Sequence, residues 1–121
     1  MSEALYKIMP ASLWARAPSE GRMPWAEVDV RDGFVHLSAA SQVRETARRH
    51  FASQHGSGQQ GELLLLEVDR SALSPGSLRW EPSRGGALFP HVYGDVPLEA
   101  VVRVRPLVQA EEGLVFPDEI P

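Results

Sequence analysis

Four consecutive leucines constrain the fold of this chain more than any other feature. They lie in residues 62–69, the most apolar stretch of the sequence, which follows Gly61 and ends in Val-Asp. Such a run is compatible with a helix, but the short length, the flanking glycine and the Val-Asp ending favour a β-strand. A strand that is apolar on both faces lies in the middle of a sheet. The sequence therefore predicts a central strand at residues 62–69.

Six or seven strands and two helices are expected along the chain. The other expected strands are Ala4–Met9, Phe34–Leu37, Leu78–Glu81, Leu88–Gly94 and Ala100–Val108. The proline at position 90 favours an edge or irregular strand there, because proline cannot donate a hydrogen bond to a neighbouring strand. Arg84-Gly85-Gly86 is typical of a hairpin turn.

The two expected helices are short and follow strands. One runs from Pro10 to Ala17 and is closed by Pro18, and the other runs from Ala39 to about Gln54. Between the first helix and residue 32, glycine, prolines and charges predict a long loop, Ser19–Arg31. The strands mostly do not alternate with helices, so the predicted fold class is α+β, a single domain with a bent or split, mainly antiparallel sheet.

Asp32-Gly33 is a strong turn dipeptide, because glycine reaches positive φ without steric cost. The strand that follows, residues 34–37, alternates so that Phe34 and His36 share one face and the two aliphatic residues share the other. A titratable ring is therefore expected near the end of a strand.

Ser38 follows that strand directly and is expected to cap the second helix. Three kinds of polar group would then face one point: the hydroxyl of Ser38, the imidazole of His36 and the N–H groups of a helix N-terminus. Such a point suits a phosphate or carboxylate group. A structural role for His36, bonded to a neighbouring carbonyl, is the competing interpretation.

Composition indicates an ordinary globular protein. With 121 residues the chain is the size of one domain, and no apolar run approaches the length of a membrane helix. The absence of cysteine excludes disulfides and thiolate metal sites, and with an acidic N-terminus that lacks signal-peptide features it predicts a cytoplasmic protein. The net charge of −4 argues against non-specific binding to nucleic acid.

His36 and His91 are the two candidate site histidines, because both lie at strand ends beside aromatic residues. They are expected to lie in one cleft. A metal site built from them with Asp29, Asp32 or Glu81 is an alternative, but no local histidine spacing supports it. No nucleophile motif, P-loop or dinucleotide fingerprint is present.

The chain resembles small bacterial proteins of the uncharacterised DUF952 domain family. The match covers about Leu5 to Val108, and the residues after it form an acidic tail, 109–121. The chain departs from the family pattern at Trp25-Ala26, where that pattern has a Gly-Ser pair. The residues that carry the resemblance are Leu5-Tyr6-Lys7-Ile8, Trp14, Ala17, Asp29, Asp32-Gly33-Phe34-Val35-His36-Leu37-Ser38, Gln42, Leu78-Arg79-Trp80-Glu81, Phe89-Pro90-His91-Val92-Tyr93-Gly94 and Pro97-Leu98.

This resemblance implies a compact ADP-ribosylation fold, a split β-sheet that binds NAD in its central cleft. The run from Val35 to Ser38 is also similar to the NAD-dependent RNA 2′-phosphotransferases. Those enzymes carry a His-Gly-Thr on the first strand, where this chain has Lys7-Ile8-Met9, and their N-terminal Arg-His pair has no counterpart here. Glu81 and Glu99 are candidates for the glutamate that many ADP-ribosyltransferases use.

The leading hypothesis is a protein that binds NAD, or a related nucleotide, as its small-molecule partner. An NAD-dependent transferase of the ADP-ribosyltransferase-like group, with ADP-ribosyl or phosphoryl transfer, is the enzyme that this implies. The alternative is a non-catalytic binding module that uses the same cleft, and a third hypothesis is a metal-dependent hydrolase. The expected catalytic residues are His36 and His91, and the expected ligand-binding residues are Ser38, Tyr93, Trp14, Tyr6 and Glu81.

Overall fold

The computed structural model describes residues 4–50, 62–83, 86–110 and 113–116. Within these ranges, the four leucines belong to strand β4 (Leu63–Asp69), which lies between β1 (Ala4–Pro10) and β7 (Val101–Ala110) and is antiparallel to both. Two short strands, β3 (Ser38–Ala39) and β8 (Gly113–Val115), complete a sheet of order β3-β1-β4-β7-β8. The predicted central strand is confirmed.

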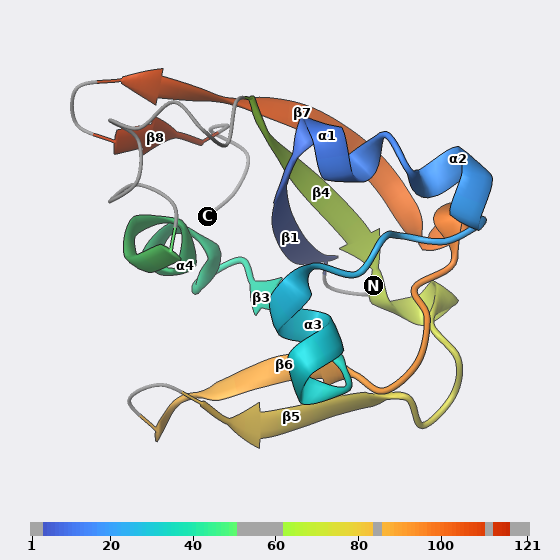
Figure 1. Ribbon diagram of the computed structural model, residues 1–121. Coiled ribbons are helices and arrows are strands. Elements are labelled where there is room, and N and C mark those ends of the chain that lie inside the picture. Colours follow the sequence, from blue (N-terminus) through green and yellow to red (C-terminus); the bar gives the residue numbers. More distant parts are fainter. Residues whose placement is uncertain (1–3, 51–61, 84–85, 111–112, 117–121) are drawn as a thin grey trace.

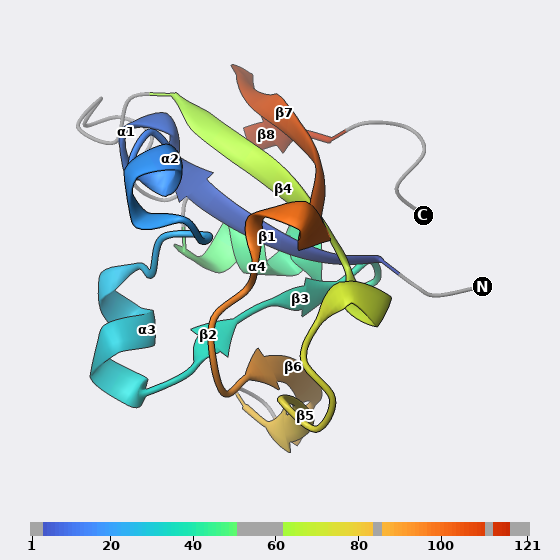
Figure 2. The ribbon, with the colours of Figure 1, turned by 90° about the vertical axis from the view of Figure 1, so that its right-hand side faces the viewer.

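A second antiparallel sheet has the order β2-β6-β5. It contains β2 (Val35–His36), β6 (Leu88–Val92) and β5 (Leu78–Pro82). The chain passes from this small sheet to the large one at residue 37, because β2 belongs to the first and β3 to the second. Figures 1 and 2 show the small sheet below the large one in both views. The α+β class with antiparallel sheets is confirmed.

The structure has more helices than the two that were predicted. In the described ranges these are α1 (Ala11–Trp14), α2 (Ala17–Glu20), α3 (Glu27–Asp32) and α4 (Val43–His50), with 3₁₀ turns at Arg70–Ala72 and Leu98–Ala100. None of these helices is long and apolar enough to cross a membrane.

The prediction of one helix followed by a long loop is wrong. Pro18 does not close a helix but lies in the first turn of α2, where its missing N–H group breaks no hydrogen bond. The predicted loop contains the rest of α2 and all of α3 except its last residue, Asp32. In α3, the side chain of Asp29 accepts a hydrogen bond of 2.9 Å from the N–H of Ala26 at the N-cap, which satisfies one of the free donors of the first turn.

Gly33 has φ of +86°, as the turn prediction requires, and it ends α3 in the left-handed conformation that favours glycine. Alternation in the following strand is also confirmed, because Val35 and Leu37 are buried in the core. The interpretation of Ser38 as a helix cap is wrong, since Ser38 lies in β3 and α4 begins at Val43. Ser38 therefore does not cap α4, although its hydroxyl contacts that of Thr46 in the first turn of this helix.

The prediction of an edge or irregular strand around Pro90 is also wrong, because β6 is the middle strand of the small sheet and pairs with β5 in regular register. Proline lacks an N–H group but keeps its carbonyl, and the carbonyl of Pro90 accepts a hydrogen bond of 3.0 Å from the N–H of Leu37. Gly86 has positive φ, whereas positions 84 and 85 of the predicted hairpin turn lie outside the described residues.

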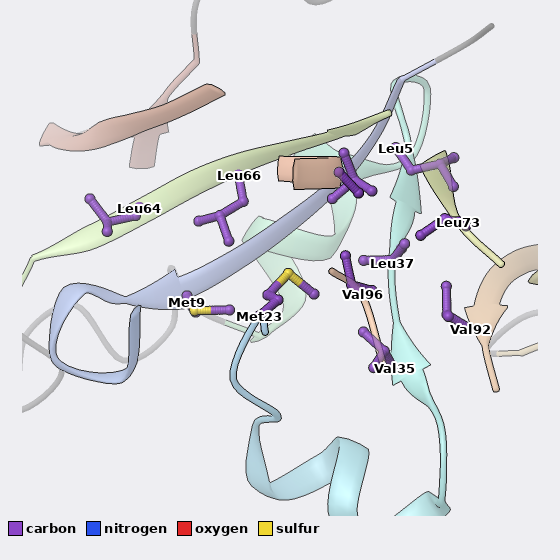
Figure 3. Packing of buried hydrophobic residues seen from close by; sticks show 12 residues of the cluster. Leu5, Met9, Met23, Val35, Leu37, Leu64, Leu66, Leu73, Val92 and Val96 are labelled. Carbon is purple, nitrogen blue, oxygen red and sulfur yellow. The ribbon is translucent and has the colours of Figure 1, made fainter. Parts of the chain in front are cut away.

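Two hydrophobic clusters cover the two faces of the large sheet. One lies between the large sheet and the small sheet, and Figure 3 shows its members from β1, β2, β4 and β6 pointing toward one another. The other lies on the opposite face of the large sheet, where Val43 and Ala47 of α4 pack against Tyr6 and Ile8 of β1. The central strand β4 contributes to both clusters, as expected for a strand that is buried on both faces.

Candidate functional site

A buried ion pair ties the large sheet to α3. The Nζ atom of Lys7, on β1, lies 3.0 and 2.9 Å from the two carboxylate oxygens of Asp29, and 2.9 Å from the carbonyl oxygen of His36. Asp29 is 0% exposed and Lys7 is 6% exposed. Removing charges from water at this depth is costly unless they are paired and hydrogen-bonded, and here they are both.

His36 lies between two carboxylates. Its backbone N–H donates to Asp29 Oδ1 at 3.0 Å, its ring Nδ1 lies 2.7 Å from the same oxygen, and its ring Nε2 lies 2.9 Å from Asp32 Oδ2. An ionised carboxylate only accepts hydrogen bonds, so both ring contacts form together when the imidazole carries both protons. The ring of His36 is therefore held at both ends.

These contacts change the acidity of the charged groups. Burial by itself raises the pKa of Asp29, but hydrogen bonds from His36 and the charge of Lys7 outweigh it and hold the pKa below its ordinary value. Burial lowers the pKa of Lys7, and the Asp29 carboxylate opposes that shift. At the surface, the hydrogen bond from Arg31 lowers the pKa of Asp32 to about 2. Both aspartates are thus ionised at neutral pH.

His91 has one carboxylate partner. Its Nδ1 lies 2.8 Å from Glu81 Oε1, which also accepts a hydrogen bond of 2.8 Å from the hydroxyl of Tyr93. The hydrogen bonds from His91 and Tyr93 lower the pKa of Glu81, so the proton between Glu81 and His91 resides on Nδ1. In the neutral ring, Nε2 then carries the lone pair, and it has no hydrogen-bond partner among the described residues.

The two histidines lie side by side. They are cross-strand partners on β2 and β6, and their ring centroids are 5.2 Å apart. The ring of Phe34 packs against both, at 4.6 Å from His36 and 4.2 Å from His91, and stacks on the latter. Tyr93 lies beyond Phe34, with 5.0 Å between the ring centroids.

A cavity of about 780 Å³ opens against the two histidines, where the two sheets, α3 and α4 meet. This volume falls within the range of about 300–1,000 Å³ that is common for small-molecule sites. Most of its lining surface is apolar, but twelve of the lining residues carry polar groups, and five of these are hydroxyls. The lining residues are Tyr6, Lys7, Ile8, Val28, Arg31, Asp32, His36, Leu37, Ser38, Ser41, Gln42, Val43, Glu45, Thr46, Ser83, Ala87, Phe89 and His91.

Residues 8–104 match the family described as "Protein of unknown function (DUF952)". The chain belongs to the DUF952 family. It is similar to protein CC0527 of Caulobacter crescentus, whose crystal structure is 39% identical, with a TM-score of 0.79 over 92% of this chain and 91% of that one. The solution NMR structure of CC0527 is 38% identical, with a TM-score of 0.73 over 92% and 90% of the two chains.

No curated protein matches the chain. Neither the DUF952 description nor the matched structures name an activity. Membership of the family therefore establishes the relationship and the fold, and the function has to be argued from the site.

The structure brings most of the sequence-predicted residues of this DUF952 protein together. His36, His91, Tyr6 and Ser38 line the cavity. Ser38 is buried, and its hydroxyl lies 2.9 Å from that of Thr46.

Three other predicted residues lie outside the cavity lining. Glu81 is bonded to Nδ1 of His91, and the hydroxyl of Tyr93 donates to Glu81. Trp14, expected to stack on a base, instead packs against the hydrophobic core from α1. A stacking role for Trp14 therefore has no support from its position.

Sequence reasoning did not assign Lys7 and Asp29 to one network. The available signal was Lys7 itself, the single lysine of the chain, placed in an apolar strand. A lysine that a sheet buries needs an acidic partner, and Asp29 is one of several candidates in the sequence.

The metal-site alternative loses support. No group of three or more histidine, aspartate, glutamate or cysteine side chains in the described ranges is arranged to hold a metal ion. The carboxylates that were its candidate ligands instead bind the histidines, Lys7 and Arg31.

Proposed function

We propose that the cavity binds a nucleotide, with NAD the first candidate, and that His91 acts there as a general base. One observation carries this proposal: His91 borders the cavity with Nδ1 held by Glu81 and with Nε2 unoccupied. A carboxylate that fixes the tautomer of a histidine leaves the other nitrogen able to accept a proton, which is the arrangement that general-base catalysis needs.

The polar groups of the lining, beside its apolar surface, support a nucleotide as the ligand. Hydroxyl groups of Tyr6, Ser38 and Ser41 can bond sugar hydroxyls, and the ring of Phe89 offers a flat apolar surface. Arg31 supplies positive charge for phosphate groups. The choice of NAD rests on the resemblance to the ADP-ribosylation fold, with which two antiparallel sheets joined at residue 37 are compatible.

The chemistry that follows is transfer to a hydroxyl. In ADP-ribosyl transfer, Nε2 of His91 takes the proton of an acceptor hydroxyl as that oxygen bonds C1′ of the nicotinamide ribose. Nicotinamide leaves with the electron pair of the broken C–N bond. In phosphoryl transfer the same nitrogen takes the proton of an acceptor hydroxyl as its oxygen bonds phosphorus, and the oxygen of the P–O bond that breaks leaves with the electron pair. Glu81 stabilises the imidazolium that forms.

A non-catalytic binding module is the second candidate, and the geometry of His36 favours it. Both ring nitrogens of His36 are bound to carboxylates, and one of these, Asp29, also joins α3 to β1 through Lys7. His36 therefore acts as a structural support for the cavity and supplies no second acid or base.

Calorimetric titration with NAD and ADP-ribose tests the proposal. Replacement of His91 by alanine is expected to weaken binding by about 1–3 kcal/mol, because a polar partner is lost in a desolvated site. Arg16→Ala is the control, since Arg16 is exposed and does not line the cavity. An affinity that is unchanged in His91→Ala would contradict the proposal. So would a protein that binds neither NAD nor ADP-ribose. Release of nicotinamide from bound NAD would show that the protein is a transferase, whereas binding without release would favour the non-catalytic binding module.

A further inference from the structure

Two side chains at the cavity, those of Arg31 and His36, share the carboxylate of Asp32. Arg31 donates to both oxygens of Asp32, from Nε at 2.8 Å and from an Nη atom at 3.1 Å. His36 Nε2 lies 2.9 Å from Asp32 Oδ2. All three residues line the cavity. The carboxylate of Asp32 thus accepts a bidentate pair of hydrogen bonds from Arg31 and also contacts the imidazole of His36.

The two aspartates of α3 differ in how firmly they are held. Asp29 is 0% exposed and is bonded to groups on β1, on β2 and at the N-cap of α3. Asp32 is the last residue of α3, its side chain is 29% exposed, and its partners are two side chains. Asp32 can therefore rotate away without breaking the connection between the sheets and the helix.

The contacts of Asp32 match those that proteins use for phosphate. Guanidinium groups bind carboxylate and phosphate with the same parallel pair of hydrogen bonds. The other cation at the cavity, Lys7, is already neutralised by Asp29 in the interior. The guanidinium of Arg31 and the ring Nε2 of His36 are therefore the groups that a ligand oxyanion can reach, and the carboxylate of Asp32 occupies that position.

We propose that Asp32 is a displaceable internal anion, and that a phosphate group of the ligand binds by replacing its carboxylate on Arg31 and His36. This deepens the proposed function, because it locates the phosphate within the nucleotide site and makes Asp32 a regulator of affinity. The ligand has to break the contact between Arg31 and Asp32 before it binds, so the native carboxylate weakens phosphate binding by competition.

Titration of the Asp32→Asn variant with inorganic pyrophosphate, NAD and adenosine tests this inference. Asparagine keeps the shape of the side chain and removes its charge. Both phosphate-bearing probes are expected to bind roughly tenfold more tightly, since a negative charge within a few ångströms of the phosphate site is lost. Adenosine, which has no phosphate, should show unchanged affinity. Addition of Arg31→Gln to Asp32→Asn should abolish the gain.

Asp95→Asn is the matched control. Asp95 also forms an exposed ion pair, with Nη1 of Arg22 at 2.6 Å, but does not line the cavity. This variant has the same net charge as Asp32→Asn. Equal gains in phosphate affinity in the two variants would mean that only the change in net charge matters, which would overturn the inference.

The outcomes separate this inference from the proposed function. If NAD binds the parent and Asp32→Asn leaves affinity unchanged or weakens it, Asp32 is not a competitor and the nucleotide proposal survives alone. If pyrophosphate gains affinity in Asp32→Asn while NAD binds neither protein, the anion site stands and the nucleotide proposal fails. If no probe binds either protein, both fail.

Discussion

Replacement of Asp29 by asparagine is expected to destabilise the protein by about 3–5 kcal/mol, the usual cost of leaving a buried charge without its partner. The carboxylate of Asp29 is the counter-ion of Lys7 and accepts hydrogen bonds from His36 and from the N–H of Ala26. Asparagine has nearly the same size, so the loss measures charge and hydrogen bonding more than packing. Urea denaturation at neutral pH gives the free energy of unfolding.

The same contacts predict how the effect depends on pH. The pKa of Asp29 in the folded protein lies below its ordinary value of 3.8. The unfolded state therefore binds the proton first as the pH falls, and the stability that Asp29 contributes is fully present above pH 3.8 and is lost below it. The difference in unfolding free energy between the parent and Asp29→Asn should shrink through that acidic range.

Asp95→Asn serves again as the control, because its exposed ion pair with Arg22 is of the kind that contributes little to stability. If Asp29→Asn loses no more unfolding free energy than Asp95→Asn, the buried network of Lys7, Asp29 and His36 does not stabilise the fold as proposed. A difference that stays constant down to strongly acidic pH would contradict the assignment of Asp29 as the ionised partner.

Leu66→Ala is expected to cost about 2–5 kcal/mol, through lost burial and a residual cavity in the core. Leu66 is 0% exposed, lies in the middle of β4, and belongs to the cluster between the two sheets. Figure 3 shows its side chain within that cluster. Neighbouring strands hold β4 on both sides, so the backbone has little freedom to fill the space. Thermal and urea unfolding of the variant measure the loss.

Leu88→Ala is the matched substitution, since it removes the same atoms from a residue that is 51% exposed on β6. Its unfolding free energy should stay within about 0.5 kcal/mol of the parent value, as is usual for surface changes. Similar losses of unfolding free energy in the two variants would mean that Leu66 is not buried in the core between the two sheets.

Features set by local chemistry were predictable from the sequence. The leucine run predicted the central strand because only burial on both faces suits four adjacent apolar side chains. The period of two in residues 34–37 separated His36 from the core, and Gly33 indicated positive φ. That His36 and His91 lie in one cleft was also predicted, from their aromatic contexts and the fold resemblance, whereas their pairing across two strands was not.

Features that depend on distant partners were not predictable. Helix α3 has six residues with two valines and three acidic groups, and it is held by the bonds of Asp29 to Lys7 and His36, which no local pattern reports. Pro90 lies in a middle strand because the small sheet uses its carbonyl and not its nitrogen. In each case tertiary contacts outweighed local preference.

The most direct test of the central claim is the side-chain ¹⁵N spectrum of His91 during titration with NAD. The account predicts that His91 in the free protein has its proton on Nδ1, and that the Nε2 signal moves as the cavity fills. The His91→Asn variant identifies the signal. A ligand that saturates the protein while the His91 resonances stay in place, or a free protein with the proton on Nε2, would contradict the account.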